Sequence, residues 1–394
     1  MNKKFLVCIL LSFSLLLSSC GSSSNTDTQT LAQAEKEFIH ALFLTEYLWY
    51  DQVASNIDYT AFSTRKGMID SLKVSPPDKW SFTWTSEEYN NFTNQKTAGF
   101  GFGFTPEFTV FLVRIGAPAY HKLYRGDKIL QINGEPASRT NLTRAKNNTT
   151  SPTTFTILRN NTQMNVVITP QEYTYKVTSG KVLTKNNQKI GYMRYDSFTD
   201  SSVSEFEKVF TTFKENNISE LIIDMRYNGG GSIDTASALL DNITNAYPNQ
   251  RQVYLDWNPN YKNRNSTYTF EGEDLADGNE LTMKRVFFLV TQNSASASEL
   301  VISALKPYLG DENVITIGTQ THGKPVGFTG HIYNNHYYFI VNFFVKNNQN
   351  QSTSFAGIPA TCTAIDDLSH LRDDENESML STALYYIDNH ICPS

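Results

Sequence analysis

The sequence is short of several features that would point to a function at once. Its 394 residues contain four cysteines and seven histidines, and no cysteine has the histidine and cysteine neighbours of a zinc site. Lysine and arginine number 33 against 39 aspartate and glutamate, and no basic run marks a nucleic-acid surface. Internal repeats of the solenoid kind are also missing. We therefore expect neither nucleic acid as a partner nor a structural metal.

Long apolar runs are rare, and the clearest one lies near the N-terminus. Residues 5–17 are almost wholly apolar and follow Lys3 and Lys4. A basic start, a short apolar segment and small residues before a cleavage point are typical of a secretory signal peptide, and the segment is too short to span a bilayer. We expect residues 1–19 to be removed on export.

The end of this segment, Leu17-Ser18-Ser19-Cys20, resembles the lipobox of bacterial lipoproteins. This predicts a lipid on Cys20 and a polar tether at residues 20–30. The protein would then belong to the bacterial cell envelope, periplasmic or at the outer membrane, with its lipid in a membrane. The alternative is an ordinary cleavage site with an incidental cysteine. Cys362 and Cys392 remain in the exported part, where a disulfide between them is expected.

The hydrophobic pattern divides the rest of the chain into three parts and predicts a multidomain α+β fold. Residues 31–96 indicate an N-terminal helical region, with an irregular aromatic stretch after Pro76-Pro77. Residues 97–172 contain short β-type segments and turn signals. In residues 173–394 buried strands alternate with amphipathic helices, which indicates a mixed sheet with helices packed on it.

The middle part contains Gly126-Asp127-Lys128-Ile129-Leu130-Gln131-Ile132-Asn133-Gly134, which is similar to the signature of PDZ domains. A PDZ domain binds an extended peptide as an added strand, and N–H groups of a loop hold the terminal carboxylate. That loop is either Gly99–Phe102 or Gly101–Phe104. We take the second, so the candidate carboxylate-binding residues are Gly101, Phe102, Gly103 and Phe104. The alternative is a generic small β-domain with an Asn-Gly hairpin.

Three consecutive glycines, Gly229-Gly230-Gly231, follow the apolar strand Leu221–Met225. Glycine permits a sharp turn that directs N–H groups toward a ligand at the start of the next helix. The spacing of a dinucleotide-binding fingerprint is not met. The oxyanion of an acyl-transfer reaction is a ligand that such a turn can bind.

A second turn carries three serines on alternate positions, Ser294-Ala295-Ser296-Ala297-Ser298-Glu299, after the apolar run Val286–Val290. A serine nucleophile needs a base, and a lysine can serve where burial leaves its amine neutral. Gly323-Lys324 supplies a lysine downstream. The neighbouring His322 could be proposed as the base, but no aspartate at a diagnostic spacing completes a Ser-His-Asp set.

Two other motifs are discounted. Gly318–Lys324 fits most of a phosphate-binding P-loop, but Pro325 replaces the residue whose hydroxyl would bind Mg²⁺. Ser303-Ala304-Leu305-Lys306 matches the S-x-x-K of β-lactamases, but the supporting K-T-G and S-D-N elements are missing.

Together these elements resemble the carboxyl-terminal processing, or tail-specific, serine proteases. The resemblance rests on Gly126–Gly134, Ile223–Gly231, Ser294–Glu299 and Gly323-Lys324, which stand in the family's order and cover the chain from about residue 97 onward. It implies a Ser/Lys protease domain preceded by a PDZ-like domain, with no metal or organic cofactor.

The same resemblance implies roles for individual residues. Ser296 would be the nucleophile and Lys324 the base. Backbone N–H groups of Ala297 and of the glycine turn would form the oxyanion hole, and there we take Gly230 rather than Gly229.

Some details of the turn and of the lysine segment need separate mention. Ser298, followed by Glu299, is expected to help cap the next helix. Members of the family often have glutamine four residues after the lysine to orient it, whereas this chain has Phe328. The separation of 28 residues between Ser296 and Lys324 is a few residues longer than expected, and we expect the insertion at Asp311–Asn313.

The expected activity is hydrolysis of proteins or peptides, recognised by their C-terminal tails, through an acyl-enzyme. One alternative is a non-catalytic peptide-binding lipoprotein that keeps an inactive protease fold. Another is a non-proteolytic acyl hydrolase that uses the same dyad.

Overall fold

The computed structural model describes residues 31–272 and 278–393. The predicted signal peptide, Cys20 and the tether at residues 20–30 lie outside the described residues. Among the described residues, no helix has both the length and the apolar character needed to cross a membrane.

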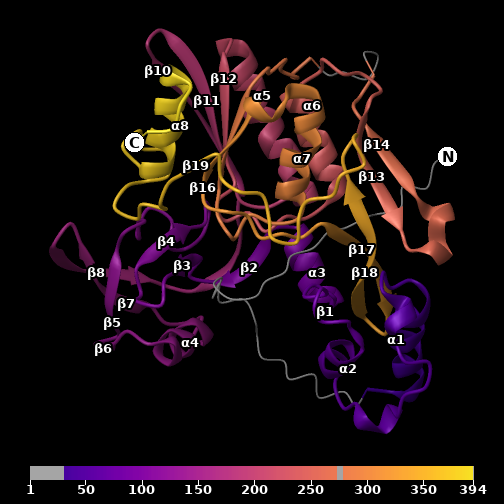
Figure 1. Cartoon of the computed structure of the whole chain (residues 1–394). Coiled ribbons are helices and arrows are strands. Elements are labelled where there is room, and N and C mark those ends of the chain that lie inside the picture. The colour runs from indigo at the N-terminus through magenta and orange to yellow at the C-terminus, as the bar shows by residue number, and fades with distance from the viewer. Residues whose placement is uncertain (1–30, 273–277, 394) are drawn as a thin grey trace.

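The centre of the C-terminal part is a six-stranded sheet (Figure 1). In spatial order its strands are β10 (Thr178–Lys185), β11 (Gln188–Tyr195), β12 (Glu220–Asp224), β15 (Val286–Val290), β16 (Val314–Gly318) and β19 (Cys362–Thr363). The β10 strand is antiparallel to β11, and all other neighbours are parallel. The strands β12, β15 and β16 are buried along their whole length, which explains their nearly continuous apolar sequences.

Helices cover both faces of this sheet. On one face α5 (Val203–Asn216), α6 (Ile233–Ile243) and α7 (Ala297–Leu309) share a core with it, and on the other face α8 (Ser378–Asn389) packs. Phe206, Phe210 and Phe213 recur at helical spacing on α5 and are all fully buried. The predicted mixed sheet with helices packed on it is therefore confirmed.

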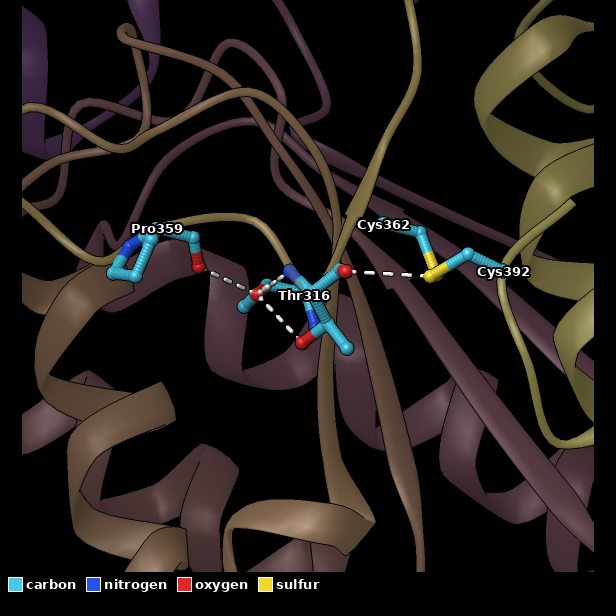
Figure 2. Close-up of a disulfide and its surroundings, with 5 residues drawn as sticks. Thr316, Pro359, Cys362 and Cys392 are labelled. Carbon is cyan, nitrogen blue, oxygen red and sulfur yellow. Dashed lines mark hydrogen bonds between the residues drawn. A yellow bond between two sulfur atoms is a disulfide. The ribbon is translucent and has the colours of Figure 1, made fainter. Parts of the chain in front are cut away.

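A disulfide ties the segment after α8 to the edge of the sheet. Cys362 on β19 and Cys392 are bonded with an S–S distance of 2.01 Å (Figure 2). Beside the bridge, the Thr316 hydroxyl on β16 donates to the main-chain oxygen of Pro359 at 2.9 Å. The two cysteines expected to pair thus link the C-terminal end to the last strand.

A second sheet joins the N-terminal region to the C-terminal part. Its central strand, β18 (His336–Lys346), pairs with β17 (Val326–Tyr333), β13 (Arg251–Trp257) and β1 (Phe82–Thr85), and β14 (Ser266–Thr269) pairs with β13. The expectation of an irregular stretch after Pro76-Pro77 is wrong, because β1 and α3 (Ser86–Thr93) form there. The partner of β1 lies far along the chain, so the local pattern does not reveal the strand.

The N-terminal helices pack on this second sheet (Figure 1). Side chains of α1 (Gln33–Thr45) and α2 (Arg65–Leu72) share one hydrophobic core with β17 and β18. A buried ion pair with an N–O distance of 2.8 Å joins Arg65 to Glu35. Short 3₁₀ helices are η1 (Tyr50–Gln52), η2 (Tyr59–Ala61), η3 (Asp200–Ser202), η4 (Pro259–Arg264) and η5 (Asp311–Asn313).

Between the N-terminal region and the C-terminal part, the chain forms a small β-domain with a core of its own, drawn in magenta at the lower left of Figure 1. Its elements are β3 (Phe102–Phe104), β4 (Val110–Val113), β5 (Lys128–Ile132), β6 (Glu135–Pro136), α4 (Arg139–Asn147), β7 (Thr153–Arg159) and β8 (Thr162–Ile168). The pair β2 (Lys96–Gly99) and β9 (Gln171–Thr174) brings the two ends of this domain together.

Candidate active site

The serine turn connects β15 to α7, and its three hydroxyls have different surroundings. Ser294 Oγ donates to the main-chain oxygen of Met225 at 2.7 Å, and Ser298 Oγ donates to that of Asn228 at 2.8 Å. Ser296 Oγ is buried and has no hydrogen-bond partner within the described residues. Two of the three serines therefore hold the turn in place, and Ser296 is available for chemistry.

Ser296 has a backbone conformation that L-residues rarely adopt, with φ +59° and ψ −114°. Such strain costs on the order of 1–3 kcal/mol and persists only where the surroundings enforce it. The helix α7 begins at Ala297, so Ser296 itself occupies the N-cap position. The expectation that Ser298 helps to cap the helix is wrong, because its hydroxyl binds the main chain of Asn228.

The buried carboxylate of Glu299 connects the serine turn to the segment that carries Lys324. Its Oε2 accepts hydrogen bonds from the backbone N–H groups of Ser296 and Lys324, both at 2.9 Å. Its Oε1 accepts from Thr321 Oγ1 at 2.6 Å and from the Gly323 N–H at 2.7 Å. One side chain therefore fixes the main chains of both predicted catalytic residues, a role that the sequence analysis did not find.

Lys324 lies between β16 and β17 and is only 2% exposed. It lines the same small pocket as Ser296. The other residues of that pocket are Val253, Leu300, Ser303, Pro325, Val345, Asn347 and Thr353. Burial lowers the pKa of Lys324 to about 7, against the opposing attraction of Asp78 and Glu299. Near pH 7 a large fraction of the molecules then carries Lys324 as a neutral amine, which a general base requires.

The glycine turn lies directly against the serine turn. Gly230 has φ +103°, and a Cβ atom there would fall 2.8 Å from Ser296 Cβ and 3.0 Å from the Ala297 nitrogen. Its own N–H donates to Asn228 Oδ1 at 2.9 Å. The structure thus brings both predicted oxyanion donors to Ser296, but Gly230 would have to release Asn228 before it could bind an oxyanion.

A network of buried charges lies next to the glycine turn. The Arg226 guanidinium is fully buried and lies 3.0 Å from Asp224, 2.8 Å from Glu377 and 2.7 Å from Asp366. The second cation of the network, Arg372, pairs with Asp224 at 2.8 Å. The sequence alone does not reveal this network, because its members come from separate segments that only the fold brings together.

The small β-domain contacts this network through Arg125, which precedes the predicted PDZ-like string. Arg125 Nη1 donates to the Tyr227 hydroxyl at 2.5 Å, and Arg125 also forms an ion pair with Asp366. Gly126 packs so closely that a Cβ atom there would lie 2.6 Å from the main-chain oxygen of Leu368. The domain is therefore seated on the residues that flank the glycine turn.

The predicted carboxylate-binding residues lie within that domain, on the loop and strand before β4. Gly101 has φ +83° and completes the turn, whereas Phe102, Gly103 and Phe104 form the strand β3. Both phenylalanine side chains are buried in the core of the domain. Only Gly101 of the chosen four therefore belongs to a loop.

His322, the other base that the sequence offered, lies two residues before Lys324 in the chain. Its Nε2 is 3.4 Å from Trp80 Nε1, and burial lowers its pKa. In the described parts of the chain, no three His, Cys, Asp or Glu side chains gather as a metal-binding group.

Comparison with known protein families gives two matches. The model of peptidase family S41 matches residues 189–360, and the model of the peptidase S41 N-terminal domain matches residues 34–82. The first range contains the glycine turn, the serine turn and Lys324.

Among curated relatives, the chain is 26% identical over 211 residues to the carboxyl-terminal-processing protease of Picosynechococcus, covering 50% of this chain and 46% of that protein. It is 24% identical over 337 residues to the carboxy-terminal-processing protease of Bartonella bacilliformis, covering 81% of this chain and 72% of that protein. The chain thus spans less than half of the first relative's length.

Among solved structures, an S41 protease from Bacteroides fragilis superimposes with a TM-score of 0.75 at 22% identity. The match covers 90% of this chain and 97% of that one. At this level of identity the similarity establishes a shared fold.

Proposed function

Because this chain belongs to peptidase family S41, a family of serine-type peptidases, we propose that it is an exported, lipid-anchored endopeptidase that recognises substrates by their C-terminal tails. The observation that carries the proposal is the pairing of Ser296 and Lys324 in one pocket. The serine hydroxyl is buried without a hydrogen-bond partner among the described residues, and burial lowers the lysine pKa to about 7.

The first half of the reaction forms an acyl-enzyme. Neutral Lys324 takes the proton of the Ser296 hydroxyl while Oγ attacks the carbonyl carbon of the scissile peptide bond. Backbone N–H groups of Ala297 and of the glycine turn stabilise the oxyanion, and Gly230 joins them when it leaves Asn228. The Lys324 ammonium then gives its proton to the departing amine, and an ester between Oγ and the acyl group remains.

The second half releases the acyl product. Lys324, neutral again, takes a proton from a water molecule as the water oxygen attacks the ester carbonyl. The same N–H groups stabilise the second oxyanion. Protonation of Oγ by Lys324 frees Ser296 and a new carboxylic acid. Glu299 keeps the two main chains in register throughout.

Other parts of the proposal have separate support. Export and lipid attachment at Cys20 are supported by the sequence pattern of residues 1–30. Recognition of C-terminal tails is supported by the PDZ-like string Gly126–Gly134 and by the similarity to carboxyl-terminal-processing proteases.

The test uses the soluble chain from Gly21 and unstructured protein substrates that differ only in an apolar or a charged C-terminus. Cleavage of the apolar-tailed substrate is expected, with loss in Ser296→Ala and in Lys324→Ala and retention in Lys208→Ala, an exposed lysine of α5. Turnover that survives both of these substitutions would contradict the proposed roles of Ser296 and Lys324. Binding of tails without any turnover by the unsubstituted chain would favour a peptide-binding lipoprotein instead.

A further inference from the structure

The N-terminal region and the C-terminal part both contribute residues to the surroundings of the Lys324 amine. Its Nζ lies 4.2 Å from the centroid of the Phe328 ring, a cation–π distance. The Phe328 ring is fixed by Phe82 of β1, at a centroid distance of 5.6 Å, and by Phe339 of β18, at 5.4 Å. A strand of the N-terminal region therefore holds the ring against which the amine rests.

The segment before β1 adds a carboxylate, Asp78, that is fully buried. Asp78 Oδ1 accepts the backbone N–H groups of Trp80 at 2.8 Å and Ser81 at 3.0 Å, and Oδ2 accepts the Ser81 hydroxyl at 2.6 Å. Ser81 Oγ in turn accepts the backbone N–H of Val341 at 3.1 Å. Val341 is the β18 residue directly opposite Phe328. The carboxylate is thus anchored to the strand pair that carries the ring beneath Lys324.

The same segment also contacts the lysine segment directly. Trp80 places its indole N–H 3.4 Å from His322 Nε2 and stacks on Phe355 with ring centroids 5.9 Å apart. These contacts press the segment of Asp78 against the residues just before Lys324.

The charges that face Lys324 can be ranked. Asp78 exerts the larger attraction on its amine and Glu299 the smaller. Burial lowers the pKa of His322, and the positive charges of Lys324 and Lys79 lower it further. The oxygens of Glu299 already accept three backbone N–H groups and the Thr321 hydroxyl.

We propose that Asp78 is a positioning residue for Lys324, so that the N-terminal region is part of the active site. Its carboxylate attracts the amine and stabilises the ammonium that forms when Lys324 takes the proton of Ser296. Phe328 and Asp78 together replace the orienting glutamine that the sequence lacks at position 328. This inference rests on the proposed function, since it assigns a partner to the base of that reaction.

The test measures the protonation of Lys324 itself, so it does not depend on turnover. The soluble chain with Ser296→Ala is labelled with ¹³C at lysine Cε, and the resonance of Lys324 is identified by its loss in Lys324→Arg. Asp78→Asn is expected to move the titration midpoint of this resonance downward by about one pH unit, because an attractive negative charge is removed. The matched control is Asp51→Asn, an exposed aspartate of the same region, which should leave the midpoint in place.

Two further variants separate charge from loop structure. Ser81→Ala removes a hydrogen bond to Asp78 but leaves its charge, and it should keep the midpoint within about 0.3 pH units of the parent. If Asp78→Asn does not fold, Asp78→Ser, which retains an acceptor for the Trp80 and Ser81 N–H groups, must show the same downward shift. An unchanged midpoint in a folded Asp78 variant would overturn the proposal. When Asp78→Asn is introduced into the chain that keeps Ser296, the acid limb of kcat/KM should shift downward by the same amount. Absence of turnover in the unsubstituted chain would count against the proposed function alone.

Discussion

The carboxylate of Glu299 accepts the backbone N–H of Lys324 at 2.9 Å, although 25 residues separate them in the sequence. The same oxygen accepts the backbone N–H of Ser296 at the same distance. One buried carboxylate therefore fixes the main chains of the proposed nucleophile and the proposed base relative to each other. The insertion expected at Asp311–Asn313 forms η5 at the far end of α7 and leaves this connection intact.

Replacing Glu299 with glutamine should cost both activity and stability. All four groups that contact its oxygens are donors, so an amide NH₂ would face a donor and leave buried N–H groups unpaired. We expect kcat to fall by about ten- to a hundredfold, and the free energy of unfolding to drop by about 1–3 kcal/mol. Glu312→Gln, at an exposed position, is the control. Equal activity of the two variants, measured on an unstructured protein substrate, would argue against a connecting role for Glu299.

The pH dependence of catalysis should report the ionisation of Lys324. Its pKa is lowered to about 7, and only the neutral amine accepts a proton from Ser296. The value of kcat/KM should therefore rise as pH increases toward 7 and become constant above it, about tenfold per unit on the acid side. Lys324→Arg should be inactive across the range, because a guanidinium stays protonated. A limb centred near the ordinary lysine pKa would contradict the buried environment.

Much of the site could be predicted from local sequence, since its chemistry depends on short turns after buried strands. The alternation around Ser296 and the three glycines both mark places where the main chain must turn sharply. The structure adds a reason to propose Ser296 rather than Ser294 or Ser298 as the nucleophile, because each of the other two hydroxyls is bound to a main-chain oxygen.

What the sequence could not supply are contacts between distant segments. Asp78 approaches Lys324 only because β1 pairs with β18, and a four-residue strand in an aromatic stretch has no clear period of its own. Similarly, Arg226 and Glu377 meet only when α8 packs on the sheet. Burial and non-local pairing decide these positions.

Gly230→Ala should abolish activity because of contact as well as backbone strain. A Cβ atom there would lie 2.8 Å from Ser296 Cβ and 2.9 Å from the main-chain oxygen of Ala295. Gly278→Ala is a matched control, since Gly278 also has a positive φ but nothing lies within 4 Å of its Cβ position. We expect a loss of more than about a hundredfold in kcat/KM for the first variant. The second should lose about 1 kcal/mol of stability and keep its activity. Similar kinetics for both would mean that the crowding at Gly230 has no catalytic importance.

Removing the charge of Lys324 should stabilise the protein while abolishing catalysis. In the folded state the pKa is about 7, compared with about 10.4 for an unfolded lysine. Between these pH values the unfolded chain binds more protons at Lys324 than the folded chain does. The contribution of Lys324 to the free energy of unfolding therefore rises with pH from about 7 to 10, and it is most unfavourable below pH 7. Lys324→Met removes that penalty.

At pH 6.5 we therefore expect Lys324→Met to gain on the order of a few kcal/mol in the free energy of unfolding, and the gain to shrink toward pH 10. Urea unfolding of the soluble chain at both pH values measures the difference. Lys128→Met, at an exposed position, should show little change at either pH. A Lys324→Met variant that is less stable than the parent at pH 6.5 would mean that the contact of the ammonium with Phe328 and its attraction to Asp78 outweigh the cost of burying it.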